Sequence, residues 1–365
     1  MRREPYLITH VEQINTPTLA VYPSIMQKNI TEALTIAGKN ILRPHVKTCK
    51  TPEVIRLMQE NGIGHFKCAT LAETEMLGML WAEDVLLAYQ PVGTAVARLQ
   101  AIIDTYPATT FSCLIDNSAT LGIWEKESLT TPLHVYLDLN VGMNRTGVTI
   151  DDALSLIQDC NDHRSVFLKG IHVYDGHIHD VDVSRRKFKA DKVFEKAIHI
   201  RNVAEDICER AMELVIGGTP TFPMYAHYEN VQCSPGTFVF WDWGYSVFKD
   251  LPFTPAALLL TRVISIIDAK RLCLDLGHKA VASENPLHNR LQFLNVESAT
   301  LISHSEEHLV VEVADTAKHF LGEVWYAIPY HICPTVALHQ ALNVIVDGKC
   351  MGEWDIVARN RKINF

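Results

Sequence analysis

The sequence predicts an α/β protein with an N-terminal (β/α)8 barrel and a C-terminal β-rich domain. Between about residues 18 and 236, short β-branched runs alternate with longer amphipathic runs. This alternation calls for a parallel sheet, and roughly eight such strands fit a closed barrel. After about residue 245, short apolar runs are separated by turn residues, which is typical of a β domain. A doubly wound sheet is the alternative, but no Gly-x-Gly-x-x-Gly turn follows the first strand.

The elements follow from apolar periodicity. Barrel strands are expected over residues 41–46, 66–69, 85–88, 111–115, 134–139, 168–174, 214–216 and 231–234. Helices are expected over residues 25–37, 52–60, 71–80, 95–104, 118–126, 150–159 and 185–210. The β domain is expected to hold strands over residues 257–267, 271–276, 292–296, 299–303, 309–313, 323–328, 341–347 and 353–357. We therefore expect a barrel over residues 22–245 and a β domain over residues 246–365, which residues 1–21 join.

The composition of the chain indicates which kinds of partner and which cellular compartment to expect. The chain has 365 residues, a formal net charge of −9 and no basic stripe, so we expect no nucleic-acid partner. No apolar run is long enough to span a bilayer, and no signal peptide precedes the first strand, so we expect no membrane partner. The nine scattered cysteines indicate reduced thiols in a cytoplasmic protein.

Lys47 is the first candidate catalytic residue. It follows an apolar run, and the helical pattern after it opens with Thr51-Pro52-Glu53, a plausible helix start. Lys47 therefore lies in a strand-to-helix loop at the carboxyl end of a strand, where α/β proteins build active sites. A lysine there can form a Schiff base; the alternative is a solvated loop lysine.

Other polar groups follow later strands. Arg145 lies in a glycine-flanked loop, and Tyr174 opens a segment that contains His177 and His179. The turn Gly217-Gly218-Thr219 can aim backbone N–H groups and a hydroxyl at an anion, or it can simply turn the chain. In a barrel these loops meet Lys47 at one face. A phosphate turn together with a Schiff-base lysine suggests pyridoxal 5'-phosphate as cofactor.

His331 and Cys333 form a candidate metal pair. In an extended segment, residues two apart project to the same side, so an imidazole and a thiolate can reach one ion. The alternative is a buried cysteine beside a hydrogen-bonded histidine. A metal ligand is the minority interpretation for His172, His177 and His179, for which we prefer hydrogen-bonding and substrate-contact roles.

Taken together, these motifs resemble the D-threonine aldolase and D-serine dehydratase family of fold-type III pyridoxal-phosphate enzymes, which is related to alanine racemase. Residues 43–48 look like its Arg-Pro-His-x-Lys signature, 217–221 like its phosphate turn, 275–280 like its Asp-x-Gly-x-Lys segment, and 331–334 like its metal motif. The resemblance covers nearly the whole chain. Tyr330 departs from the family pattern, which has asparagine before the metal histidine.

The resemblance implies roles for these residues. Lys47 would carry the cofactor as a Schiff base, Arg145 would lie near its phenolic oxygen, and Tyr174 near its pyridine nitrogen. Gly217, Gly218 and Thr219 would hold its phosphate. His331 and Cys333 would bind a divalent metal (Zn, Mn or Mg), with His331 counted as catalytic. The resemblance also implies a homodimer in which the β domain of one subunit covers the cofactor of the other.

The implied activity is cleavage of D-β-hydroxy amino acids to glycine and an aldehyde. The alternative is a D-serine, D-threonine or 3-hydroxy-D-aspartate dehydratase. The segment after the strand 168–174 favours the aldolase, because the equivalent aldolase loop also carries Tyr-x-Gly. Two further alternatives are a non-catalytic carrier of pyridoxal phosphate and a scaffold barrel that binds no cofactor. The physiological substrate, the metal in vivo and the role of Asp275 stay open at this point.

Overall fold

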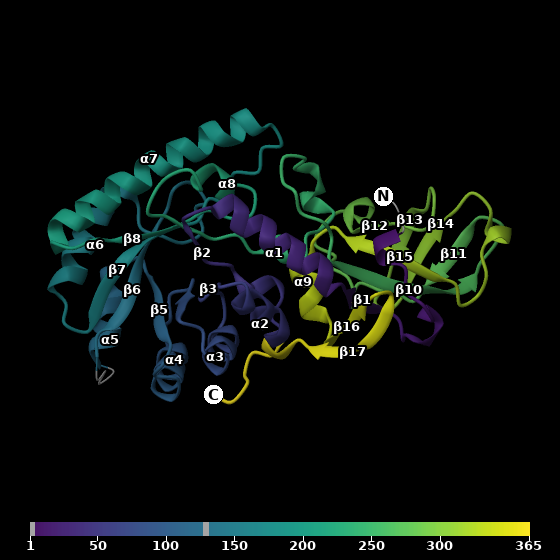
Figure 1. Cartoon of the computed structure of the whole chain (residues 1–365), viewed down its shortest axis with the longest axis horizontal. Coiled ribbons are helices and arrows are strands. Elements are labelled where there is room, and N and C mark those ends of the chain that lie inside the picture. The colour runs from purple at the N-terminus through teal and green to yellow at the C-terminus, as the bar shows by residue number, and fades with distance from the viewer. Residues whose placement is uncertain (1–3, 127–130) are drawn as a thin grey trace. The chain divides into compact units, whose positions relative to one another are not determined.

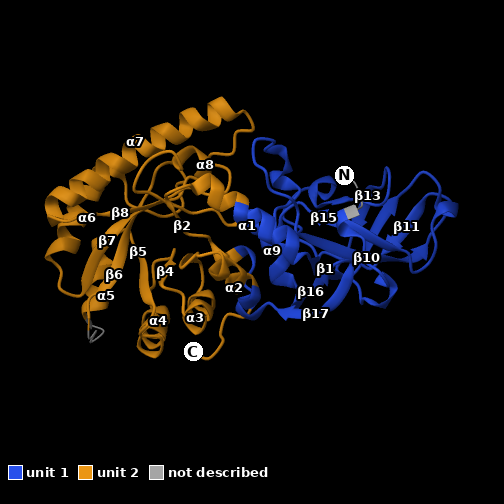
Figure 2. Cartoon of the chain, in the orientation of Figure 1, with its two compact units in different colours: residues 1–31, 48–53, 237–359 blue, residues 32–47, 54–236, 360–365 orange. Residues whose placement is uncertain are grey.

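The computed structural model describes residues 4–126 and 131–365, which form two compact units (Figure 2). The barrel unit comprises Glu32–Lys47, Val54–Gly236 and Asn360–Phe365. The β unit comprises the chain up to Thr31, Thr48–Glu53 and Thr237–Arg359. No helix among the described residues combines the length and the apolar character that crossing a bilayer requires.

The barrel unit is built on eight parallel strands. Their order is β2-β9-β8-β7-β6-β5-β4-β3. The strands are β2 (Ile41–Leu42), β3 (His65–Cys68), β4 (Asp84–Leu87), β5 (Thr110–Ile115), β6 (Leu133–Leu139), β7 (Val166–Val173), β8 (Glu213–Ile216) and β9 (Gln232–Cys233). A single parallel bridge between His45 and Lys67 links the two ends of this row, so the barrel is nearly closed. The predicted fold class is confirmed.

The first barrel strand is shorter than predicted. We expected a strand over residues 41–46, but β2 ends at Leu42 and Val46–Thr48 form a 3-10 turn. Pro44 has no N–H and cannot donate to a ladder. Between these elements the chain stays extended, because the N–H groups of Arg43 and His45 donate to Cys233 O and Pro235 O, each at 2.8 Å.

The predicted barrel helices are present. They are α1 (Pro23–Ala37), α2 (Pro52–Glu60), α3 (Leu71–Met79), α4 (Thr94–Thr105), α5 (Leu121–Lys126), α6 (Ile150–Asp162) and α7 (Val183–Cys208), and Figure 1 shows α6 and α7 on the outside of the barrel strands. Side chains of Thr70, Thr149 and Asp182 cap three of them by accepting hydrogen bonds from backbone N–H groups of the first turn. A short helix, α8 (Phe222–Tyr225), was not predicted.

The β unit contains a nine-stranded sheet. Its main path is β13-β14-β11-β10-β1-β16-β17, and β15 pairs with both β10 and β12. The strands are β1 (Thr18–Val21), β10 (Ala257–Ile266), β11 (Arg271–Leu274), β12 (Leu291–Phe293), β13 (Thr300–His304), β14 (Leu309–Glu312), β15 (Val324–Pro329), β16 (Ala341–Val346) and β17 (Lys349–Asp355). Strand β1 joins this sheet although it lies near the start of the chain, because it pairs antiparallel to β10 and parallel to β16.

Residues 237–245 lie in the β unit, whereas we expected the barrel to run to residue 245. Backbone hydrogen bonds account for this placement. The N–H groups of Trp243 and Gly244 donate to Pro329 O and Tyr330 O, and Ala256 N–H donates to Phe240 O. This segment is therefore tied to strands of the β unit.

Candidate active site

Three cationic side chains converge on the ring of Tyr174 at the carboxyl ends of the barrel strands. The Lys47 Nζ lies 5.7 Å from the ring centroid, and the Lys67 Nζ lies 5.8 Å from it. The guanidinium carbon of Arg145 lies 5.2 Å from the same centroid. Cations at these distances are attracted by the ring, but they also repel one another. The structure thus brings together three residues that the sequence predicted, Lys47, Arg145 and Tyr174, and adds Lys67.

Local backbone features place these side chains. Lys47 lies in the 3-10 turn after β2, and its N–H donates to His45 Nδ1 at 3.3 Å. The loop after β6 is organised by Asn140, whose Oδ1 accepts from Gly142 N and Asn144 N. A Cβ at Gly176 would lie 2.5 Å from the Tyr174 ring. The close approach of this ring to the backbone two residues later therefore requires glycine at position 176.

The turn Gly217-Gly218-Thr219 differs in part from the expectation. Its glycine N–H groups do not aim at an open space, because Gly217 N donates to Val173 O at 3.1 Å and Gly218 N to Thr221 Oγ1 at 3.1 Å. Gly217 adopts a φ of 85°, which favours glycine. Thr219 Oγ1 accepts from Gly236 N at 3.0 Å, so the turns after β8 and β9 meet at this hydroxyl.

A buried histidine–aspartate pair lies in the same half of the barrel. His172 Nδ1 and Asp138 Oδ1 are 2.8 Å apart. Burial lowers the pKa of His172 and so favours its neutral form, although the hydrogen bond with Asp138 acts in the opposite direction. Burial alone would raise the pKa of Asp138, but hydrogen bonds from His172, Thr146 and Gln90 outweigh it and hold this pKa below its usual value. Within the described residues, His172 Nε2 and His177 Nδ1 are buried and have no hydrogen-bond partner.

Lys67 is the functional candidate that sequence reasoning missed. It stands inside β3, between the buried residues Phe66 and Cys68, and only 2% of its surface is exposed. Burial, followed by the charge of Lys47, lowers its pKa to about 7. The sequence contained an indication of this role. Both faces of a barrel strand are covered, so a lysine within the short run Phe66–Ala69 is expected to be buried.

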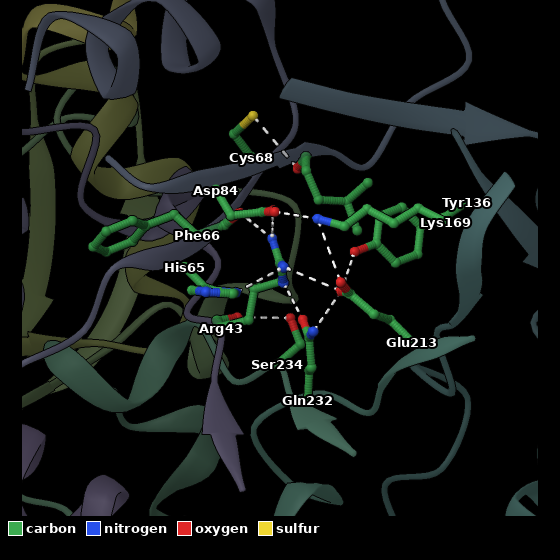
Figure 3. A network of polar contacts seen from close by, with 11 residues as sticks. Arg43, His65, Phe66, Cys68, Asp84, Tyr136, Lys169, Glu213, Gln232 and Ser234 are labelled. Atoms are coloured by element: carbon green, nitrogen blue, oxygen red, sulfur yellow. Dashed lines mark hydrogen bonds and ion pairs between the residues drawn. The ribbon is translucent and has the colours of Figure 1, made fainter. Parts of the chain in front are cut away.

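The amino-terminal half of the barrel interior holds a second polar cluster, shown in Figure 3. Arg43 is fully buried, and its Nη1 donates to Asp84 Oδ1 at 2.6 Å. Lys169 contacts both Asp84 and Glu213. Tyr136 Oη donates to Glu213 Oε2 at 2.5 Å. Every charge in this cluster meets an opposite charge, which is typical of a structural network rather than a binding site.

The candidate metal pair lies in the β unit and is helical rather than extended. His331 is the N-cap of α9 (Ile332–Leu338), so Cys333 occupies the first helical turn. The assumption of an extended segment was wrong, because Asp242 Oδ2 accepts from Ile332 N at 3.0 Å and supports a helix start here. The two side chains still meet, since a hydrogen bond with Cys333 contributes to the pKa of His331.

The surroundings of His331 are acidic. Its Nδ1 lies 2.6 Å from Glu284 Oε1. Burial would lower the pKa of His331, but Cys333, Glu284 and Asp242 raise it to about 9. Among the described residues, no group of three or more His, Cys, Asp or Glu side chains has a geometry suited to a metal ion. Asp275 has a structural role, because it accepts hydrogen bonds from Thr16, Thr261 and the backbone of Arg262.

A nearly closed barrel with lysines at its carboxyl face, followed in sequence by a β-rich unit, defines the alanine racemase-like class of proteins. Residues 23–241 match the family model "Alanine racemase, N-terminal domain", and residues 256–345 match the model "Putative serine dehydratase domain". The first match spans more than half of the chain. The chain therefore belongs to the alanine racemase N-terminal domain family.

Individual relatives agree with the resemblance predicted from the sequence. A D-threonine aldolase of Arthrobacter sp is 25% identical over 361 residues, which cover 95% of this chain and 93% of the relative. The crystal structure of D-threonine aldolase from Filomicrobium marinum superposes with a TM-score of 0.86 at 23% identity, over 97% of this chain and 98% of that one. D-threo-3-hydroxyaspartate dehydratase from Delftia sp. HT23 superposes with a TM-score of 0.77 at 20% identity, over 94% and 98%.

Proposed function

We propose that this protein is a pyridoxal-phosphate- and divalent-metal-dependent enzyme of the D-threonine aldolase type, which cleaves D-β-hydroxy amino acids to glycine and an aldehyde. The observation that carries the proposal is the convergence of Lys47 and Arg145 on the ring of Tyr174. Two like charges beside one ring repel each other, and a bound anion would relieve this repulsion. Pyridoxal phosphate is such an anion, and it also carries an aldehyde that a lysine amine can attack.

The lining of the site fits this cofactor. Two buried imidazole nitrogens, His172 Nε2 and His177 Nδ1, have no hydrogen-bond partner among the described residues. A buried polar atom without a partner is costly, so a ligand atom nearby would compensate for it. Gly218 also presents no side chain, and a Cβ there would come within 3.3 Å of Tyr174.

The chain's own residues would share the work as follows. Lys47 would hold the cofactor through its amine, Arg145 would neutralise the phenolic oxygen, and Thr219 would donate its hydroxyl to the phosphate. The cofactor would supply an electron sink at the substrate's α-carbon. Tyr174 would orient the ring without placing a carboxylate beside it. Lys47 would move a proton on its side of the site once its amine is released.

The metal part of the proposal rests on His331 and Cys333. An imidazole and a thiolate suit zinc, and open positions would leave room for a substrate oxygen. Glu284 supports this assignment, because a carboxylate on Nδ1 leaves Nε2 to face an ion. A metal at the β-hydroxyl would raise the acidity of that group. The substrate class is a small D-amino acid, and we propose a homodimer.

A dehydratase is the second candidate function, and Cys333 favours it. Two solved structures of D-threo-3-hydroxyaspartate dehydratase are a cysteine-to-alanine mutant in the metal-free form and a histidine-to-alanine mutant. The two mutated positions are two residues apart, as His331 and Cys333 are here. The family model over residues 256–345 also names a serine dehydratase.

The products distinguish the two candidates. The protein loaded with pyridoxal phosphate and zinc is incubated with D-threonine and with D-serine, and the products are identified by mass spectrometry. Glycine with acetaldehyde supports the aldolase, whereas 2-oxobutyrate or pyruvate supports the dehydratase. Chelation should abolish either activity, and added zinc should restore it. Turnover that survives complete metal removal would overturn the metal-dependent proposal.

A further inference from the structure

Lys67 is a buried amine that has no carboxylate in contact. It lies on β3, is 2% exposed, and forms none of the ion pairs found among the described residues. Lysine is rarely buried without a partner, because desolvating an ammonium group is costly. A second lysine of the barrel strands, the partly buried Lys169, contacts both Asp84 and Glu213. Lys67 therefore differs from a structural lysine of the same barrel.

The surroundings of Lys67 disfavour its charged form. Lys47 and Arg43 face it and oppose a further positive charge, while Asp175 and Asp138 favour one. Both carboxylates are already engaged, since Asp175 accepts from Tyr225 Oη at 2.6 Å and Asp138 pairs with His172. Burial is the largest influence and, with these charges, lowers the pKa of Lys67 to about 7. An amine of this pKa can both accept and release a proton at physiological pH.

The amine of Lys67 lies at the candidate active site. Its Nζ and that of Lys47 approach the same Tyr174 ring, at 5.8 Å and 5.7 Å from the centroid. The bridge between His45 and Lys67 fixes the backbone of β3 beside the segment that carries Lys47. One lysine can therefore hold the cofactor while the amine of the other stays available beside the same ring.

We propose that Lys67 is a second catalytic lysine, which accepts the proton of the substrate's β-hydroxyl during cleavage. This inference rests on the proposed function. The hydroxyl proton moves to Lys67 Nζ, and the carbon–oxygen single bond becomes a carbonyl. The Cα–Cβ bond breaks, and its electron pair stays with Cα. Cα then takes up a proton from the released Lys47 amine to give glycine. Lys47 regains a proton from solvent and Lys67 returns its proton to solvent, so the protons balance over one turnover.

The first test measures the amine itself, without turnover. Lysine side chains labelled with ¹³C at Cε are titrated by NMR in the cofactor-free protein, and Lys67→Met assigns the resonance. We expect one lysine signal that titrates near pH 7 and is missing from the variant. The exposed Lys187, which pairs with Asp191, serves as an internal reference. A Lys67 signal that titrates with the exposed lysines would overturn the proposal.

The second test separates proton transfer from cofactor binding. Loaded Lys67→Met should keep its cofactor affinity within about threefold of wild type, while kcat for D-threonine falls about 10²–10⁴-fold. Lys67→Arg keeps the positive charge but cannot release a proton, so it should be equally impaired. The rise in kcat/KM around pH 7 should disappear in both variants. Lys187→Met should behave as wild type.

The outcomes separate the two proposals. A wild-type protein that releases neither glycine nor a keto acid overturns the proposed function. If wild type is active, two results overturn only the role of Lys67. One is a Lys67→Met variant that is also active, and the other is an unchanged pH profile in that variant. Full activity in Lys67→Arg would show that only the charge matters and would likewise overturn proton transfer.

Discussion

The two halves of the barrel interior differ in how their charged side chains are paired. In the amino-terminal half, Arg43 contacts Asp84 at 2.6 Å, and Lys169 lies 3.4 Å from Glu213 (Figure 3). In the carboxyl-terminal half, Lys47, Lys67 and Arg145 surround one tyrosine ring. The first set of charges is complete without a ligand, and the second is not. We infer that the paired charges of the amino-terminal half stabilise the fold. The unpaired basic groups of the carboxyl-terminal half lower its stability and would favour the binding of an anion.

The largest effect is expected from Lys47→Ala. The variant should lose the visible absorbance of lysine-bound cofactor, and activity should fall by more than about 10³-fold, because the amine that holds the cofactor is removed. Stability of the cofactor-free protein should change little, since Lys47 is only half-buried. Spectra of the loaded protein and urea unfolding check the two parts. An unchanged spectrum would instead support a barrel that binds no cofactor through Lys47.

A substitution in the amino-terminal half of the barrel interior should lower stability and leave activity unchanged. Asp84→Ala leaves Arg43 and Lys169 with the more distant carboxylate of Glu213, at 3.8 Å and 3.4 Å, so the free energy of unfolding should fall by about 3 kcal/mol. Urea unfolding at pH 7 measures this loss. Activity per folded molecule should be retained. A variant that folds normally but no longer binds cofactor would contradict the division of roles.

The pH dependence of Asp84 provides a control. Burial would raise the pKa of Asp84, but Arg43 and Lys169 outweigh it and hold this pKa below its usual value. A lowered folded-state pKa gives stability that is present above the unfolded-state pKa and is lost as pH falls through the folded-state pKa. The difference between wild type and Asp84→Asn should therefore shrink as the pH is lowered below about 4.

Sequence patterns predicted the parts of this molecule that depend on local periodicity. Apolar runs located the barrel strands to within a few residues, and motif spacing located Lys47, Arg145 and Tyr174. The pairing of Arg43 was not predictable, because its partner Asp84 comes from another strand and meets it only in the closed barrel. Helix α9 was missed because its start depends on Asp242, which lies about 90 residues earlier in the chain.

Lys67, which is buried, and Lys169, which is partly buried, allow a second comparison between the two halves. Lys67→Met removes an amine without a carboxylate partner, so the cofactor-free protein should become more stable at pH 7, by about 1–4 kcal/mol. Lys169→Met removes a partner of Asp84 and Glu213, so the protein should become less stable by a similar amount. Urea unfolding of both variants measures the difference in sign.

The sign of the pH dependence follows from the lowered pKa of Lys67. Its folded-state pKa is about 7, whereas an unfolded lysine titrates near 10.5. The unfolded chain therefore binds the extra proton between these values, and wild type gains stability as pH rises. The advantage of Lys67→Met should be full below pH 7 and should shrink towards pH 10.5. An advantage that is independent of pH would mean that Lys67 is not neutralised on folding.

The smallest effect is expected from Tyr136→Phe. Tyr136 is fully buried and donates to Glu213, but Glu213 also contacts Lys169 and accepts from Gln232 at 2.5 Å. Because the carboxylate keeps these partners, the loss of one hydrogen bond should cost about 1 kcal/mol in urea unfolding. Cofactor affinity should stay unchanged, since Tyr136 belongs to the paired half of the barrel. A fall in cofactor affinity of tenfold or more would mean that the two halves are coupled, and the separation of stability from binding would have to be abandoned.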